Sequence, residues 1–135
     1  MKNGYMEKIL DVDLGSGKIE TIDFPEEATK QYLGGSGLAA WYLNKETDPA
    51  TIDPLGPENT FVLLTGPVCG TPVYSSSRYE ACAKAPLTGV WGEANSGGKV
   101  AQDLKSAGYD GLILRTDRVG IPARGVTAVR RRHRH

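Results

Sequence analysis

The sequence contains few of the residues from which most metal and acid–base sites are built. Among its 135 residues there are two cysteines and two histidines. Cys69 and Cys82 cannot by themselves supply the four ligands of a structural zinc site or an iron–sulfur cluster. His133 and His135 lie at the C-terminal end, which leaves the preceding residues without a histidine for acid–base catalysis. We therefore expect no catalytic residue in this chain.

Long apolar runs and an N-terminal targeting segment are also absent. No run reaches the roughly eighteen apolar residues of a membrane-spanning helix. The first residues lack the apolar core of a signal peptide. Together these absences predict a cytoplasmic protein with no membrane partner.

Positive charge is scarce in most of the chain, although the formal net charge is zero. Residues 1–114 contain nine Lys and Arg against fifteen Asp and Glu, a net charge of −6, whereas residues 115–135 contain seven Arg against one Asp, a net charge of +6. This Arg-rich segment has no helical or strand periodicity. One interpretation is a basic tail that binds nucleic acid or another polyanion. We prefer a shift of reading frame near Arg115, because an out-of-frame GC-rich gene encodes many arginines.

The first 114 residues alternate between short strands and short helices. The patterns predict strands at residues 10–14, 18–24, 60–65, 78–84 and 111–114, and helices at residues 25–32, 38–43 and 98–107. Ser36 is expected to cap the second helix. Asp11 is expected to be a solvated charge, and Arg78 and Lys84 to share a polar strand face. Strands outnumber helices, so we predict an α+β fold with β-rich mixed sheets and a few short helices.

The segment from Arg78 to Gly98 holds the strongest candidate for a binding site. Arg78 is the only arginine before Arg115, and Asn95-Ser96-Gly97-Gly98 leads into a predicted helix. Backbone N–H groups at such a turn lack partners within the helix, so a phosphate is the expected ligand, with Arg78 as a bidentate donor. The alternative is that the glycine pair is only a tight strand-to-helix connection and Arg78 only a surface charge, and composition alone favours this alternative.

Several short motifs together resemble one known family. They are Arg78-Tyr79, Ala85-Pro86-Leu87-Thr88-Gly89, Trp91-Gly92 and Asn95-Ser96-Gly97-Gly98, preceded by Tyr32-Leu33-Gly34-Gly35, Asp53-Pro54-Leu55-Gly56-Pro57-Glu58-Asn59 and Thr65-Gly66-Pro67. In this order and spacing they are similar to the N-terminal domain of tungsten-containing aldehyde:ferredoxin oxidoreductases, over about residues 5–114. Ser36 departs from the family, which usually has Arg or Lys there, so one anion contact is missing.

The resemblance implies that residues 1–114 form part of the base under a bis-pterin cofactor. The cofactor would hold tungsten, or molybdenum, and a magnesium ion would join the pterin phosphates. Arg78 would contact a pterin or its phosphate, Asn95 would present its backbone carbonyl to the magnesium, and Gly97 would allow close backbone approach. The parent enzyme would oxidise aldehydes to carboxylic acids with ferredoxin as electron acceptor.

The same resemblance defines the expected partners. The [4Fe–4S] cluster and the substrate channel of the parent enzyme belong to later domains. This chain is therefore expected to be inactive alone and to assemble with those domains. Ferredoxin would partner the full enzyme, a homodimer is left open, and nucleic acid is not expected. The alternative function is a phosphate- or polyanion-binding module that uses the Gly97-Gly98 turn and the Arg-rich segment. A steep salt dependence of nucleic-acid binding would identify that module.

Overall fold

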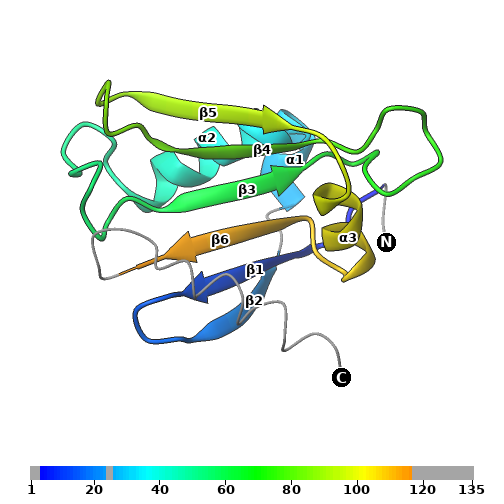
Figure 1. Cartoon of the computed structure of the whole chain (residues 1–135), viewed down its shortest axis with the longest axis horizontal. Helices are drawn as coiled ribbons and strands as arrows, with labels where there is room; N and C mark the ends of the chain where they lie inside the picture. Colours follow the sequence, from blue (N-terminus) through cyan, green and yellow to red (C-terminus); the bar gives the residue numbers. More distant parts are fainter. Residues whose placement is uncertain (1–3, 24–25, 117–135) are drawn as a thin grey trace.

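The computed structural model of the chain describes residues 4–23 and 26–116, and the Arg-rich segment beyond Thr116 lies outside them. The described residues form a six-stranded mixed sheet and three helices (Figure 1). The strands are β1 (Lys8–Asp13), β2 (Ile19–Asp23), β3 (Phe61–Thr65), β4 (Tyr79–Lys84), β5 (Trp91–Ser96) and β6 (Gly111–Arg115), and the helices are α1 (Glu26–Tyr32), α2 (Gly35–Glu46) and α3 (Val100–Ser106). The predicted α+β fold is confirmed.

The sheet has the strand order β2-β1-β6-β3-β4-β5. Strands β1 and β2 form the predicted antiparallel hairpin. Strand β6 lies parallel to β1 and antiparallel to β3, so it joins the hairpin to the rest of the sheet. Strands β3, β4 and β5 continue the sheet as antiparallel neighbours.

Helices α1 and α2 pack on one face of the sheet, and this contact forms the hydrophobic core (Figure 1). The core side chains from the strands are Ile9, Val62, Leu64, Cys82 and Ile113, and those from the helices are Ala28, Leu38, Ala39, Tyr42 and Leu43. Cys82 is 1% exposed. The prediction of one polar face along residues 78–84 is therefore wrong at Cys82, because the Cys82 side chain is buried against α2. Alternation separates two strand faces but does not say which one is covered.

Strand β5 is not predicted from the sequence pattern. Its segment follows Pro86 and contains glycine and small polar residues, which are typical of a turn. In the structure it pairs with β4 along its whole length and forms an exposed edge of the sheet. Pairing with a neighbouring strand overrides the weak local preference. As a result Asn95 lies in a strand, opposite Glu80, rather than in a turn.

Arg115, at the end of β6, forms a polar cluster with Asp11 of β1 and with Tyr42 and Glu46 of α2. Arg115 Nε donates to Asp11 at 3.0 Å, and Arg115 Nη2 donates to Glu46 at 3.1 Å and to the Tyr42 hydroxyl at 2.7 Å. The expectation that Asp11 is a solvated charge is wrong, because the carboxylate is paired and only 17% exposed. Strand β6 includes Arg115, which the charge pattern groups with the Arg-rich segment.

The junction between α1 and α2 is held close to the end of β3. A Cβ atom built on Gly34 would lie 2.6 Å from the Thr65 carbonyl oxygen, so only glycine fits there without a shift. Helix α2 already begins at Gly35, and no side chain caps it. The prediction that Ser36 caps this helix is wrong, because the Ser36 hydroxyl instead donates to Glu93 at 3.0 Å. Close packing against the Thr65 carbonyl thus explains why residue 34 is a glycine.

Candidate functional site

Arg78, Asn95 and Gly97 lie together at one end of the β4–β5 pair. Arg78 precedes β4 and Gly97 follows β5, and the antiparallel register places Tyr79 opposite Ser96. A Cβ atom built on Gly97 would lie 3.7 Å from Arg78 Nη1. Because Cβ and the backbone nitrogen of one residue are about 2.5 Å apart, the guanidinium lies within roughly 6 Å of the Gly97 amide nitrogen. One phosphate could therefore contact both groups.

The Arg78 guanidinium is oriented through its Nε atom. This Nε donates to Asn95 Oδ1, and Asn95 Nδ2 in turn donates to Glu80 Oε1. Within residues 4–23 and 26–116, the two Nη nitrogens make no hydrogen bond, and no carboxylate forms an ion pair with Arg78. The exposed guanidinium keeps the donors that a bidentate phosphate contact requires.

The turn after β5 contains two glycines. Gly98 has a φ of 90°, a conformation that residues with a side chain rarely adopt. Its carbonyl accepts a hydrogen bond from the Ser77 hydroxyl. Helix α3 begins at Val100 and has seven residues, so the anion contact depends on the turn and on Arg78 rather than on a long helix. The structure thus brings the predicted residues together, while their contacts with a cofactor stay a prediction.

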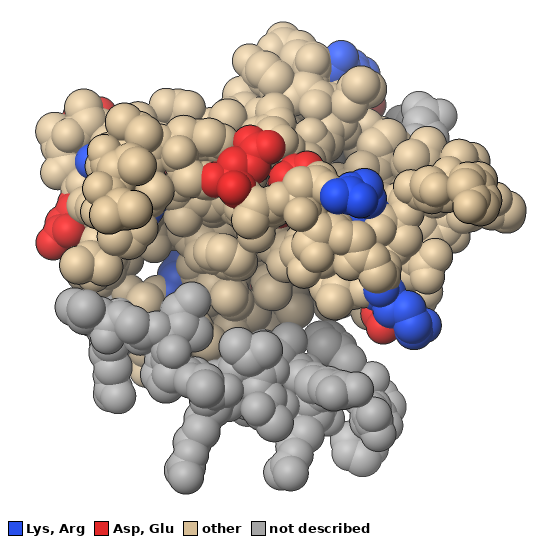
Figure 2. Space-filling model, turned by 45° about the horizontal axis from the view of Figure 1, so that its top comes forward, with Lys and Arg blue, Asp and Glu red and all other residues tan. Residues whose placement is uncertain are grey.

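Basic side chains do not gather on the face of the molecule shown in Figure 2. The Lys and Arg side chains of the described residues form separate spots there and no continuous patch. No helix among the described residues is long and apolar enough to cross a membrane. The expected cytoplasmic location stays a prediction.

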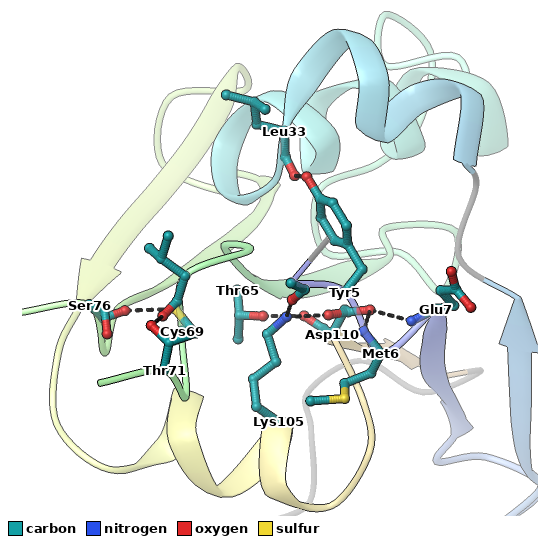
Figure 3. Close-up of polar contacts among 12 residues, drawn as sticks. Tyr5, Met6, Glu7, Leu33, Thr65, Cys69, Thr71, Ser76, Lys105 and Asp110 are labelled. Atoms are coloured by element: carbon teal, nitrogen blue, oxygen red, sulfur yellow. Dashed lines mark hydrogen bonds and ion pairs between the residues drawn. The ribbon is translucent and has the colours of Figure 1, made fainter. Parts of the chain in front are cut away.

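A buried ion pair connects the N-terminal segment to α3 and β6 (Figure 3). Lys105 and Asp110 are each 1% exposed, and Lys105 Nζ donates to Asp110 Oδ1 and, at 2.8 Å, to the Gly4 carbonyl. Asp110 Oδ2 accepts hydrogen bonds from the amides of Met6 and Glu7, each at 2.8 Å. These bonds offset the desolvation of the two charges. Sequence reasoning missed the pair, because two charges beside a helix end are usually exposed.

The loop between β3 and β4 leads to Arg78 and packs on this buried pair. A Cβ atom on Gly70 would lie 3.1 Å from Lys105 Cβ, so the loop approaches α3 closely. The buried Cys69 Sγ lies 2.9 Å from the Ser76 carbonyl oxygen and 3.1 Å from that of Arg78. The Cys69 thiol therefore positions the backbone from which the Arg78 side chain extends.

The thiol of Cys82 is expected to make stability sensitive to alkaline pH. Burial, followed by the charges of Glu93 and Glu80, raises its pKa to about 12. The unfolded thiol has a pKa of about 8.5. Since the folded pKa is raised, the stabilisation is complete below about pH 8.5 and is lost as the pH rises towards 12. Urea unfolding across this range should show the decline.

Cys82→Ala provides the comparison for this pH dependence. The variant lacks the thiol, so its free energy of unfolding should decline less steeply between about pH 9 and 12 than that of the parent chain. Burial also raises the pKa of Tyr42 to about 12. The free energy of unfolding of both proteins should therefore decline in the same way above about pH 10 because of Tyr42. Parallel pH profiles of the two proteins would contradict the role of Cys82.

Comparisons with known proteins match most of the chain to one family. Residues 9–118 match the family model described as aldehyde ferredoxin oxidoreductase, N-terminal domain. Tungsten-containing aldehyde ferredoxin oxidoreductases from Pyrococcus furiosus and Pyrococcus horikoshii are 42% and 45% identical over 111 residues, which cover 82% of this chain and 18% of each relative. An aliphatic sulfonate oxidoreductase, WOR-like subunit, from Pyrococcus furiosus is 39% identical over 114 residues, with the same coverage.

A solved structure shows the same fold. It is the active site complex BamBC of benzoyl coenzyme A reductase in complex with 1,5-dienoyl-CoA. Its match has a TM-score of 0.81 and 35% identity and covers 85% of this chain and 18% of that chain. The present chain thus spans about a fifth of the length of the proteins it matches.

Proposed function

Because the chain belongs to the aldehyde ferredoxin oxidoreductase family, through its N-terminal domain, we propose that it supplies part of the base that binds a tungsten–pterin cofactor. The parent enzyme would oxidise an aldehyde to a carboxylic acid and pass the electrons to ferredoxin. When bound, the metal cofactor supplies the redox chemistry, whereas the residues of this domain bind and orient it. The polyanion-binding alternative has no support among the relatives described above.

The observation that carries the proposal is the convergence of Arg78 and Gly97. The absence of a side chain at Gly97 leaves room beside Arg78 Nη1, and the two Nη nitrogens of Arg78 have no hydrogen-bond partner among the described residues. A pterin phosphate fits this combination of charge, donors and open backbone. The side-chain amide of Asn95 is already bonded to Arg78 and Glu80, so a magnesium contact would use the Asn95 backbone carbonyl.

The remaining domains of the parent enzyme are the proposed partners of this chain. Large apolar side chains are exposed in the loop before Arg78, including Val73 and Tyr74, the latter 95% exposed. Leu33, beside the α1–α2 junction, is also exposed. These exposed apolar side chains are the proposed contacts with another domain of the parent enzyme. A homodimer and binding of ferredoxin to the parent enzyme stay predictions.

Arg78→Ala is expected to weaken binding of a pterin phosphate by about 1.5–3 kcal/mol, the usual contribution of a hydrogen bond to a charged group. This corresponds to a roughly 10- to 150-fold higher dissociation constant. Isothermal titration of the full chain with the pterin phosphate, and with inorganic phosphate as a simpler probe, measures the change.

Lys99→Ala is the matched control. Lys99 is an exposed cation two residues after Gly97, and it already pairs with Asp103 at 3.1 Å. Its loss should leave phosphate affinity nearly unchanged. Equal affinities of the parent chain and Arg78→Ala would show that Arg78 is only a surface charge.

A further inference from the structure

A cavity of about 210 Å³ lies at the end of β4 remote from Arg78. Its walls come from the C-terminal half of α2, the loop between α2 and β3, and the β4–β5 turn, which meet at the left of Figure 1. Most of the lining is apolar, with Leu43, Ile52, Val90 and Trp91 as the main contributors. Six residues of strand separate this end from Arg78, a distance of roughly 20 Å. The cavity is therefore separate from the phosphate site.

Lys84 brings a positive charge to this apolar wall. The residue is half-buried, and its Nζ atom donates to the Ile52 carbonyl at 2.8 Å. Across the part of the chain that the structure describes, no carboxylate forms an ion pair with Lys84. An ammonium has three donors, so two of them remain for a ligand. A partly buried cation is costly unless its charge and donors are compensated, which favours a negatively charged ligand.

The cavity walls are held in place by hydrogen bonds. Asn59 Nδ2 donates to the Lys84 carbonyl at 2.9 Å, and Asn59 Oδ1 accepts from the Lys84 amide at 3.0 Å. This pair of bonds ties the loop to the end of β4. On the other side, Trp91 Nε1 donates to Glu93 Oε2 at 2.9 Å, which fixes the indole ring. A preorganised wall loses less conformational freedom when a ligand binds.

We propose that this cavity binds a small organic carboxylate. The carboxylate accepts hydrogen bonds from Lys84 Nζ, and the apolar body of the ligand packs against Trp91. The volume sets the size of the ligand, because a cavity of about 150 Å³ is known to hold benzene. At about 210 Å³, this cavity accepts a six-membered ring that carries one carboxyl group.

Three probes of similar size and different charge test the proposal. Benzoate, benzyl alcohol and benzylamine are titrated into the full chain, and the indole N–H signal of Trp91 is followed by NMR. We expect benzoate to bind at least tenfold more tightly than benzyl alcohol and benzylamine to bind most weakly. Equal affinity for benzoate and benzyl alcohol would overturn the proposal, as would shifts confined to the Trp41 signal.

Lys84→Met tests the source of the charge preference. It keeps an apolar side chain of similar length, and the tenfold preference for benzoate should disappear. Lys45→Met is the matched control, because Lys45 lies on α2 over the Trp41 ring, 5.0 Å from its centroid, and does not line the cavity. This control and Arg78→Ala should both bind benzoate like the parent chain. An unchanged preference in Lys84→Met would overturn the proposal, and the probe series on the unaltered chain decides it if that variant does not fold.

Discussion

Asp110→Ala is expected to lower the free energy of unfolding by about 3–5 kcal/mol, the usual cost of removing one partner from a buried ion pair. Among the described residues, the change leaves the buried Lys105 ammonium with the Gly4 carbonyl as its hydrogen-bond acceptor and with the Tyr5 ring, whose centroid is 5.7 Å away. It also removes the acceptor of the Met6 and Glu7 amides. Urea unfolding followed by circular dichroism measures the loss. A decrease below about 1 kcal/mol would mean that the pair contributes no more than an exposed one.

Two further variants show that burial causes this effect. Asp103→Ala breaks an exposed ion pair, in which the Lys99 side chain is 79% exposed and the Asp103 side chain 62%. This change should lower the free energy of unfolding by less than about 1 kcal/mol. The double variant Lys105→Met with Asp110→Leu removes both buried charges. It should recover part of the loss, because the apolar pair requires no desolvation of an unpaired charge.

Gly34→Ala is expected to cost about 3 kcal/mol of stability, near the upper end of the usual range for overpacking. The new methyl group would lie 2.6 Å from the Thr65 carbonyl oxygen and 3.2 Å from the Gly66 Cα, so backbone atoms have to shift. Backbone conformation does not contribute, because the φ of Gly34 is 167°, which any residue adopts. Thermal or urea unfolding measures the difference.

Gly66→Ala is the matched control for this steric argument. It lies in the segment that Gly34 approaches, but a Cβ atom built on it would meet no atom within 4 Å. Its replacement should leave stability unchanged or raise it by up to about 1 kcal/mol, through the reduced entropy of the unfolded chain. Similar stabilities of the two variants would refute a close contact between the α1–α2 junction and β3.

Local patterns in the sequence are sufficient to predict most of the elements. The β1–β2 hairpin follows from alternating apolar residues around a Gly-rich turn, and β3 and β6 follow from short apolar runs between turn residues. Strand β5 could not be predicted in this way, because its pairing with β4 is a tertiary interaction. For the same reason, alternation did not reveal that the Cys82 face of β4 is covered by α2.

The candidate site could be predicted in part. The family resemblance of the surrounding motifs implies Arg78, Asn95 and Gly97 as site residues, and antiparallel pairing of β4 with β5 brings them together. The sequence could not indicate that Asn95 orients Arg78, because this contact depends on the strand register. It also could not indicate that Lys105 and Asp110 are buried, since burial of a charge depends on the N-terminal segment that packs over it.

The position of β6 in the sheet has a consequence for biosynthesis. This strand is the last described element to leave the ribosome, yet it lies between β1 and β3, which are separated by about fifty residues. Until it emerges, the nascent chain can hold only a two-stranded and a three-stranded piece, each with an unpaired edge that is prone to aggregation. We therefore expect slow, late completion of folding, as is usual for folds with distant strand pairings. A chaperone that shields the facing edges of β1 and β3 would act during this interval.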